Sequence, residues 1–225
     1  LSAYPIIVAN SPPSNAPKKY LFINRGKELV AVAEALRRSN TRLVLITGVG
    51  GIGKSSLASE AARRLSWRFP GGVVWASARS GQRTTLETFI QDIGTLLSLD
   101  LGQTEPKVKM QQIIDELRQK AYLLIVDSFE MLSDDEQDRF IELFTALDPY
   151  SGTKVILTSR TLLPKIEGLD GTAVITLSRG LDESQGLLLL WHLAKQRGEE
   201  TLLRQPRERL QHLVRMVGGH PLALE

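Results

Sequence analysis

The hydrophobic residues of this chain follow two alternating patterns. Leu29, Val32, Ala33 and Leu36 recur at the spacing of a helix face. Beyond them, short runs rich in Leu, Val and Ile alternate with amphipathic segments. We predict strands at five of these runs: LVLIT (43–47), VVWASA (73–78), YLLIVD (122–127), KVILT (154–158) and AVITL (173–177). Because these runs are apolar on both faces and are separated by helices, they predict an α/β fold with a parallel sheet covered on both sides.

Two of the intervening helices carry a start signal. Thr84 to Glu87 and Ser133 to Glu136 each have the pattern of a capping box. In this motif, a hydroxyl at the start of a helix and a carboxylate three residues later satisfy free backbone amides. The apolar stripes of these two helices are predicted at Leu86, Phe89, Ile90, Ile93, Leu97 and at Phe140, Ile141, Phe144, Leu147.

The two ends of the chain differ from this centre. Residues 1–20 hold several prolines among Ser, Asn and Ala, which predicts an arm or linker without a core of its own. After Leu181 the strand pattern stops. Helices are predicted over Leu187 to Lys195 and from Pro206, as the first helical residue, to a stop at Gly218. We therefore divide the chain into an arm (1–20), an α/β domain (21–180) and a helical subdomain (181–225).

The composition limits the classes of protein that fit. The chain has 225 residues, of which 42% are hydrophobic, so it can bury a sizeable core. Its net charge is +3, with basic and acidic residues mixed, which favours a solvated surface over a nucleic-acid site. Cys is absent, and the longest apolar run, LLLLW at 187–191, is too short to span a membrane. We expect a soluble, cytoplasmic protein and, because the chain starts with Leu1 rather than Met, an excerpt of a longer one.

The segment GVGGIGKS, residues 48–55, carries the most specific chemical signal. It matches the pattern GxxxxGK[ST] between a predicted strand and a predicted helix. Glycines let successive backbone amides point at phosphate oxygens, and the positive end of the helix adds to the attraction. Lys54 is predicted to reach the β- and γ-phosphates, and the Ser55 hydroxyl to ligate Mg²⁺. The predicted phosphate-binding residues are Gly48, Gly50, Gly51, Ile52, Gly53, Lys54, Ser55 and Ser56.

A second Mg²⁺ ligand is predicted at the end of a neighbouring strand. Phosphate sites of this type use an Asp at the carboxyl end of an apolar strand, and Asp127 ends YLLIVD. Many proteins with a phosphate site of this type hold a second acidic residue at the position after this Asp, where it polarises the attacking water. In this chain that position is Ser128. Glu130 is the nearest carboxylate and is the candidate base.

An arginine follows a third strand. KVILT runs into Ser159 and Arg160, which places a guanidinium at the edge of the sheet that faces the phosphates. There Arg160 can sense or stabilise the charge of a γ-phosphate; the alternative is an ordinary surface arginine. The candidate catalytic residues are therefore Lys54, Asp127, Glu130 and Arg160.

The order of the motifs resembles a known family. FINRGKEL, GVGGIGKSS, GGVVWASAR, YLLIVDSFE, KVILTSR, LDESQGLLLL and GGHPLALE follow one another as in the nucleotide-binding core of the STAND class of signal-transduction ATPases. That class includes the NB-ARC proteins of plant immunity and apoptosis and many bacterial regulators. The resemblance spans about 22–225 and implies a five-stranded parallel sheet of order 5-1-4-3-2, with the strand that ends at Arg160 beside the strand that precedes Gly48.

The resemblance also implies an adenine site and further domains. The residues implied to contact the adenine are Phe22, Ile23, Asn24, Arg25 and Pro221. The backbone around Ile23 would hydrogen-bond the base. Asn24 and Gly26 depart from the family, whose first motif usually has Gly and Glu at these positions. A winged-helix segment is expected after Glu225.

Together these observations predict a switch ATPase that binds ATP or ADP with Mg²⁺ and controls the assembly or activity of a larger regulatory protein. Slow hydrolysis is expected because Ser128 cannot act as a carboxylate base. The absence of an Asn-Lys-x-Asp motif favours adenine over guanine. The expected partners are the nucleotide, other domains of the same protein and further copies in a nucleotide-dependent oligomer, with no membrane or direct nucleic-acid partner. The alternatives are an AAA+-type or other P-loop ATPase with continuous turnover, and a nucleotide-binding scaffold without hydrolysis.

Overall fold

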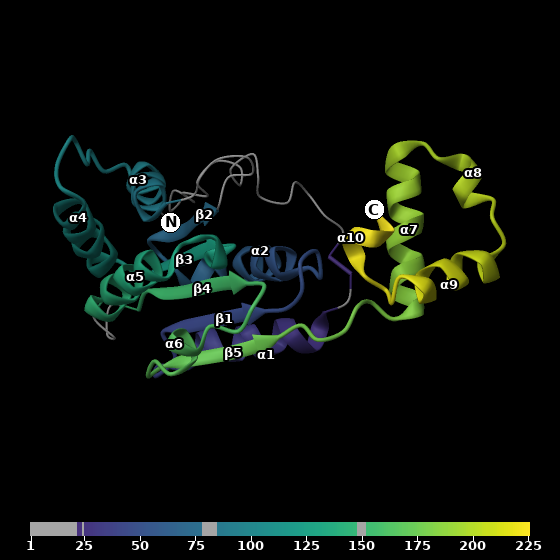
Figure 1. Ribbon diagram of the computed structural model, residues 1–225, viewed down its shortest axis with the longest axis horizontal. Coiled ribbons are helices and arrows are strands. Elements are labelled where there is room, and N and C mark those ends of the chain that lie inside the picture. Colours follow the sequence, from purple (N-terminus) through teal and green to yellow (C-terminus); the bar gives the residue numbers. More distant parts are fainter. Residues whose placement is uncertain (1–21, 24, 78–84, 148–151) are drawn as a thin grey trace, which may run out of the picture.

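A single parallel sheet with helices on both faces forms the centre of the molecule, and a group of helices follows it at the C-terminal end (Figure 1). This is a computed structural model, which describes residues 22–23, 25–77, 85–147 and 152–225. The predicted arm over 1–20, together with Asn24 and Thr84, lies outside the described residues.

The five strands lie close to their predicted positions. They are β1 (Leu43–Thr47), β2 (Gly72–Ser77), β3 (Tyr122–Asp127), β4 (Lys154–Ser159) and β5 (Thr172–Thr176). Their order across the sheet is β2-β3-β4-β1-β5, and all four pairs of neighbours are parallel. The predicted strand order is therefore confirmed, with β4 between β1 and β3. This order brings the carboxyl ends of β1, β3 and β4 together at one edge of the sheet.

Helices and short helical turns precede, connect and follow the strands. They are α1 (Gly26–Arg37), α2 (Lys54–Leu65), η1 (Ser66–Arg68), α3 (Leu86–Leu96), α4 (Pro106–Gln119), η2 (Phe129–Met131), α5 (Asp134–Ala146), α6 (Pro164–Glu167), α7 (Glu183–Arg197), α8 (Glu200–Leu203), α9 (Arg207–Met216) and α10 (Pro221–Leu224). None of the helices in the described part of the chain combines the length and the apolar character that a membrane crossing requires.

Alternate residues of each strand enter two separate cores. One core holds Leu43, Leu45 and Leu124 against the apolar faces of α3, α4 and α5. The other holds Val44 and Ile46 against α1 and α2. Because successive side chains of a strand point to opposite faces, strands that are apolar throughout require helices on both sides. This arrangement is the covered sheet that the sequence predicts.

The helix start signals are confirmed in one case and wrong in detail in the other. At the start of α5, Ser133 and Glu136 form the predicted capping box. At the start of α3, the box is formed by Thr85 and Thr88, not by Thr84 and Glu87. The Thr88 hydroxyl accepts a hydrogen bond from the Thr85 amide at 3.0 Å, a role that the sequence pattern assigned to a carboxylate.

The C-terminal helices pack around a small core of their own. Leu190 on α7, Val214 on α9 and Leu224 on α10 are its buried members. Pro206 precedes α9 instead of being its first helical residue. After α9, Gly218 and Gly219 have positive φ angles, and the Leu181 amide donates to the Gly219 carbonyl at 2.8 Å. This turn directs α10 toward the loop between β1 and α2.

Candidate nucleotide-binding site

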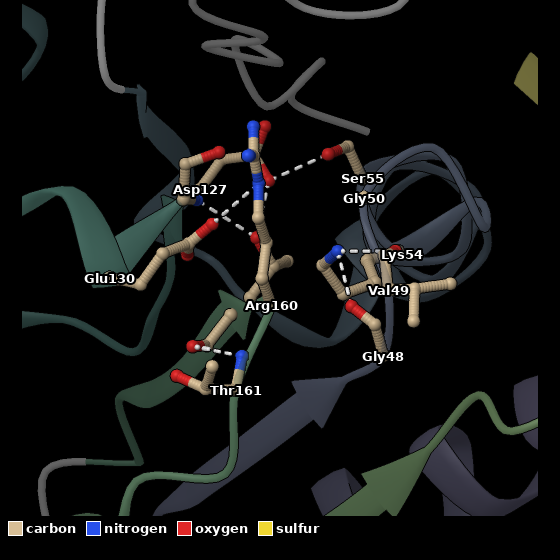
Figure 2. A network of polar contacts seen from close by, with 12 residues as sticks. Gly48, Val49, Gly50, Lys54, Ser55, Asp127, Glu130, Arg160 and Thr161 are labelled. Carbon is tan, nitrogen blue, oxygen red and sulfur yellow. Dashed lines mark hydrogen bonds and ion pairs between the residues drawn. The ribbon is translucent and has the colours of Figure 1, made fainter.

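The predicted site residues converge at the carboxyl edge of the sheet, where the loop after β1 faces the ends of β3 and β4 (Figure 2). In parallel α/β sheets, ligands bind outside the carboxyl ends of the strands. Figure 2 shows Lys54 and Ser55 on one side of this site and Asp127 and Glu130 on the other, with Arg160 between them.

The loop over residues 48–53 has the geometry of a phosphate cradle. Gly48, Gly51 and Gly53 have φ angles of 148°, 73° and 105°, which favour glycine over other residues. The backbone amides of Gly50, Gly51, Gly53, Lys54 and Ser55 donate no hydrogen bond to any part of the chain that the structure describes. A run of unpaired amides at the start of a helix fits a ligand with several anionic oxygens.

Lys54 is folded back onto this loop. Its Nζ donates to the carbonyls of Gly48 and Val49 at 2.8 and 3.1 Å. Burial lowers the pKa of Lys54; the charge of Glu130 acts in the opposite direction, and that of Arg160 lowers the pKa further. Both charges thus lie close enough to influence the lysine. A phosphate group at this position would favour its protonated form.

The two predicted Mg²⁺ ligands are in contact. The Ser55 hydroxyl donates to Asp127 Oδ1 at 2.7 Å. A third residue, Thr158 on β4, donates to the same oxygen at 2.5 Å, and its hydroxyl accepts a hydrogen bond from the Ser128 amide at 2.9 Å. Thr158 has no exposed surface, so its hydroxyl fixes both the carboxylate and the turn that follows β3.

The site residues fit a magnesium ion that binds together with phosphate groups better than a metal ion that protein side chains alone coordinate. Among the described residues, no group of three or more His, Cys, Asp or Glu side chains gathers as a metal site. Mg²⁺ prefers oxygen ligands, retains several waters, and binds through one or two carboxylates together with substrate phosphates. A hydroxyl and a carboxylate in contact beside a phosphate cradle match this donor set.

Glu130 reaches the site through an unusual turn. Ser128 has φ 62° and ψ 48°, a left-handed conformation that is uncommon for residues other than glycine. The chain turns sharply there into η2, and Glu130 returns toward the site. Its Oε1 lies 3.2 Å from Arg160 Nε, and its Oε2 is buried without a hydrogen-bond partner among the described residues.

The carbonyls of the loop are bound from outside it. His220 Nε2 lies 2.7 Å from the Gly50 carbonyl, and the Leu222 amide donates to the Gly51 carbonyl at 3.4 Å. The Arg25 guanidinium donates to the Ile52 carbonyl at 3.0 Å. Segments from both ends of the described chain therefore hold one side of the loop and leave its amides on the other.

The implied adenine residues are placed less completely than the phosphate residues. Phe22 packs against the core formed with α1 and α2, Ile23 is buried, and Asn24 lies outside the described residues. Pro221 is the first residue of α10 and precedes Leu222 at the loop. Ser56 lies in the first turn of α2.

Two residues that support the candidate site were not predicted from the sequence. Thr158 belongs to KVILT, but the apolar pattern of a strand does not indicate that one of its residues supports a carboxylate on the neighbouring strand of the sheet. The contact of His220 with the Gly50 carbonyl depends on how the C-terminal helices fold, which no local pattern in the sequence indicates. Val126 of β3 pairs with Leu157 of β4, and Asp127 and Thr158 are the residues that follow them. The alignment of these two strands was therefore the signal that could have placed Thr158 beside Asp127.

Comparisons with known proteins agree with this geometry. A match to the NB-ARC domain covers residues 25–163. An uncharacterized WD repeat-containing protein of Nostoc sp. (strain PCC 7120) is 27% identical over 237 aligned residues, which cover 93% of this chain and 18% of that protein. The crystal structure of a STAND protein with a tetratricopeptide repeat sensor from Pyrococcus horikoshii matches with a TM-score of 0.63 at 21% identity, over 93% of this chain and 30% of that one.

A second solved structure has the same fold. The ADP form of the ORC2 protein of Aeropyrum pernix matches with a TM-score of 0.60 at 17% identity, over 84% of this chain and 55% of that one. The chain thus spans less than a third of the Nostoc and Pyrococcus proteins and about half of the Aeropyrum protein.

Proposed function

Because the chain belongs to the NB-ARC family, we propose that it binds ATP and ADP with Mg²⁺ and acts as a slow regulatory ATPase within a larger protein. The observation that carries this proposal is the set of backbone amides of Gly50, Gly51, Gly53, Lys54 and Ser55 that find no acceptor among the described residues, with the Lys54 side chain and the contact between Ser55 and Asp127 beside it. No other described part of the chain combines an anion cradle with hard oxygen ligands.

Each side chain has a role that follows from its position. Lys54 would exchange the loop carbonyls for β- and γ-phosphate oxygens, a substitution that its flexible stem permits. Ser55 and Asp127 would hold Mg²⁺, which when bound neutralises phosphate charge. Arg160 would read the γ-phosphate, and Glu130 would accept a proton from the attacking water. The adenine would lie between the segment around Ile23 and Pro221.

The proposed output is a nucleotide-dependent state rather than turnover. His220 and Leu222 bind the loop that would hold the phosphates, so the C-terminal helices would respond to the nucleotide bound in that loop. We propose that residues 21–180 form the nucleotide-binding unit and that residues 181–225 form a helical unit whose position depends on the bound nucleotide. The larger protein would act in the cytoplasm. WD and tetratricopeptide repeats in the matched proteins suggest that sensor domains accompany such units.

The Mg²⁺ role can be tested by nucleotide titration with and without the ion. Asp127→Ala should weaken ATP binding when Mg²⁺ is present and change it little in EDTA, because the lost contact acts through the ion. Asp138→Asn on α5 is a matched control, since it removes an exposed carboxylate that pairs with Lys165 outside the site. Equal loss of affinity in both conditions would contradict the assignment of Asp127 as a metal ligand.

Hydrolysis should be slow in this chain alone. We expect a single-turnover rate well below roughly 1 s⁻¹ for the wild type, and a further decrease for Glu130→Gln. Glu87→Gln is the control, because Glu87 pairs with Lys109 on the α3–α4 side of the sheet and should leave the rate unchanged. A rate of about 1 s⁻¹ or more without any partner would favour a turnover enzyme. An unchanged rate in Glu130→Gln would remove Glu130 as the base.

A further inference from the structure

We propose that Arg160 is a latch on Glu130 that the γ-phosphate releases: the ion pair between them holds the base away from water until ATP draws the guanidinium to its terminal phosphate. This inference rests on the proposed function and specifies how the site is regulated. It predicts that ADP leaves the pair intact, because ADP has no γ-phosphate.

The position of Arg160 between the base and the phosphate loop supports the latch. Arg160 follows β4 and Glu130 lies in η2, and their side chains meet with Nε 3.2 Å from Oε1. On its other side, Arg160 lies over the loop, since a Cβ placed on Gly50 would be 3.7 Å from Arg160 Nε. Figure 2 shows the side chain rising between these two partners. One guanidinium can therefore exchange the carboxylate for a phosphate by a small rotation.

The two side chains differ in exposure. The Arg160 side chain is 64% exposed, whereas that of Glu130 is 14% exposed. An ion pair with one largely solvated partner contributes little to stability and breaks readily. The terminal phosphate carries two negative charges and the carboxylate carries one, so the γ-phosphate should attract the guanidinium more strongly than Glu130 does. The mobile partner is therefore the arginine, and the carboxylate stays in place.

The unused oxygen of Glu130 indicates what the released carboxylate would do. Oε2 is buried and has no hydrogen-bond partner among the described residues, a state that costs free energy unless water or a ligand supplies a donor. When Arg160 leaves Oε1, the carboxylate can accept a proton from a water. The oxygen of that water forms a bond to the γ-phosphorus, the bond to the bridging oxygen breaks, and ADP and inorganic phosphate leave.

A double-mutant cycle on nucleotide selectivity tests the latch without measuring hydrolysis. We would titrate ADP and a non-hydrolysable β,γ-imido analogue of ATP, both with Mg²⁺, into the wild type, Glu130→Gln, Arg160→Ala and the double variant. Glu130→Gln should raise the affinity for the analogue relative to ADP by roughly two- to fivefold, the effect of releasing a partly exposed ion pair. The same substitution should give no gain when Arg160 is already alanine.

The outcomes separate the latch from its alternatives. An equal gain in both backgrounds would mean that Glu130 simply repels the γ-phosphate, and no gain in either would mean that the pair does not restrain Arg160; both results overturn the latch. Glu87→Gln, which removes an ion pair on α3, should leave the selectivity unchanged. The ADP titration reports on folding and on the proposed function: absence of ADP binding in the wild type would refute nucleotide binding itself, whereas normal ADP binding with a preference for the analogue over ADP that does not depend on Arg160 would refute the latch alone.

Discussion

Asp127 takes its orientation from two hydroxyl groups on different elements. Ser55 on α2 and Thr158 on β4 both donate to Oδ1, and the Thr158 hydroxyl also accepts the amide of Ser128. The carboxylate is thus held in place before any ion binds. In addition, the Ser128 amide, at the start of the turn that carries Glu130, is tied to the same threonine.

Thr158→Val should therefore destabilise the protein and weaken Mg²⁺-dependent binding. Valine has nearly the same shape but leaves the Ser128 amide without its acceptor, which should lower the free energy of unfolding by about 1 to 3 kcal/mol. Thr158→Ser keeps the hydroxyl and is the matched control. Urea unfolding of the three proteins checks this. A valine variant as stable as the wild type would show that the hydroxyl contributes nothing.

At the residue scale, the sequence predicted the side chains that converge at the candidate site but not those that hold them in place. Lys54, Ser55 and Asp127 belong to patterns of fixed spacing, so their convergence follows from strand and helix positions alone. Thr158 and His220 act through contacts between segments far apart in the chain, and no local pattern encodes such contacts. The left-handed conformation of Ser128 decides where Glu130 points, and no pattern in the sequence predicts it.

Helix α2 begins at the end of the glycine-rich loop 48–53 and is stabilised further along by an acidic residue. Glu60 accepts hydrogen bonds from Arg63 and Arg64 at 2.6 to 2.8 Å. The hydrogen bond from Arg63, assisted by that from Arg64, lowers the pKa of Glu60 from 4.5 to about 2. Because the folded pKa lies below the unfolded one, this contribution is fully present above pH 4.5 and is lost as the pH falls toward 2.

Acid unfolding should reveal how much the ion pairs of Glu60 with Arg63 and Arg64 stabilise the protein. The free energy of unfolding of the wild type should fall more steeply than that of Glu60→Gln as the pH decreases from about 5 to 3, since glutamine cannot be protonated in that range. Both arginines are largely solvated, so the difference should be modest and should shrink at high salt. Stability curves that run parallel over this range would contradict the role of Glu60.

The contact between the loop and α10 depends on the absence of a side chain at Gly51. A Cβ there would lie 2.5 Å from Leu222 Cβ and 2.8 Å from His220 Cε1. Gly53 also has a positive φ, but a Cβ on it would meet nothing within 4 Å. The two glycines therefore separate backbone strain from interference with α10.

Gly51→Ala should loosen α10, whereas Gly53→Ala should not. Both variants should lose stability, about 1 to 3 kcal/mol, because alanine is strained at positive φ. Only Gly51→Ala should speed hydrogen exchange at the backbone amides of α10, since only there does the new methyl group displace Leu222. Similar protection of α10 in both variants would show that the loop does not hold this helix.

At the element scale, most of the structure was predictable from periodicity. The five strands and the sheet covered on both faces follow from apolar runs alternating with amphipathic segments, and their order followed from the resemblance to the family. The errors lie at helix ends. Thr88 replaces a carboxylate at the start of α3, and Pro206 precedes α9, because a start signal can shift by one residue without changing the helix that it opens.

In the whole molecule, the loop that would bind phosphate lies between the sheet and the C-terminal group of helices and contacts α10. The NB-ARC match confirms the family inferred from the motif order. What the sequence did not predict is that His220, Leu222 and Arg25 bind successive carbonyls of that loop. These contacts connect the loop to both ends of the described chain, an arrangement that fits the switch proposed above.

Thermal unfolding with and without nucleotide tests the central claim most directly. A ligand that binds only the folded state stabilises it by about 2.7 kcal/mol at a hundredfold excess over its dissociation constant, which corresponds to a rise of about 5 to 10 °C in melting temperature for a chain of this size. ADP or ATP with Mg²⁺ should produce this rise in the wild type, and Lys54→Ala should abolish it. A wild-type melting temperature that neither nucleotide changes would contradict the account.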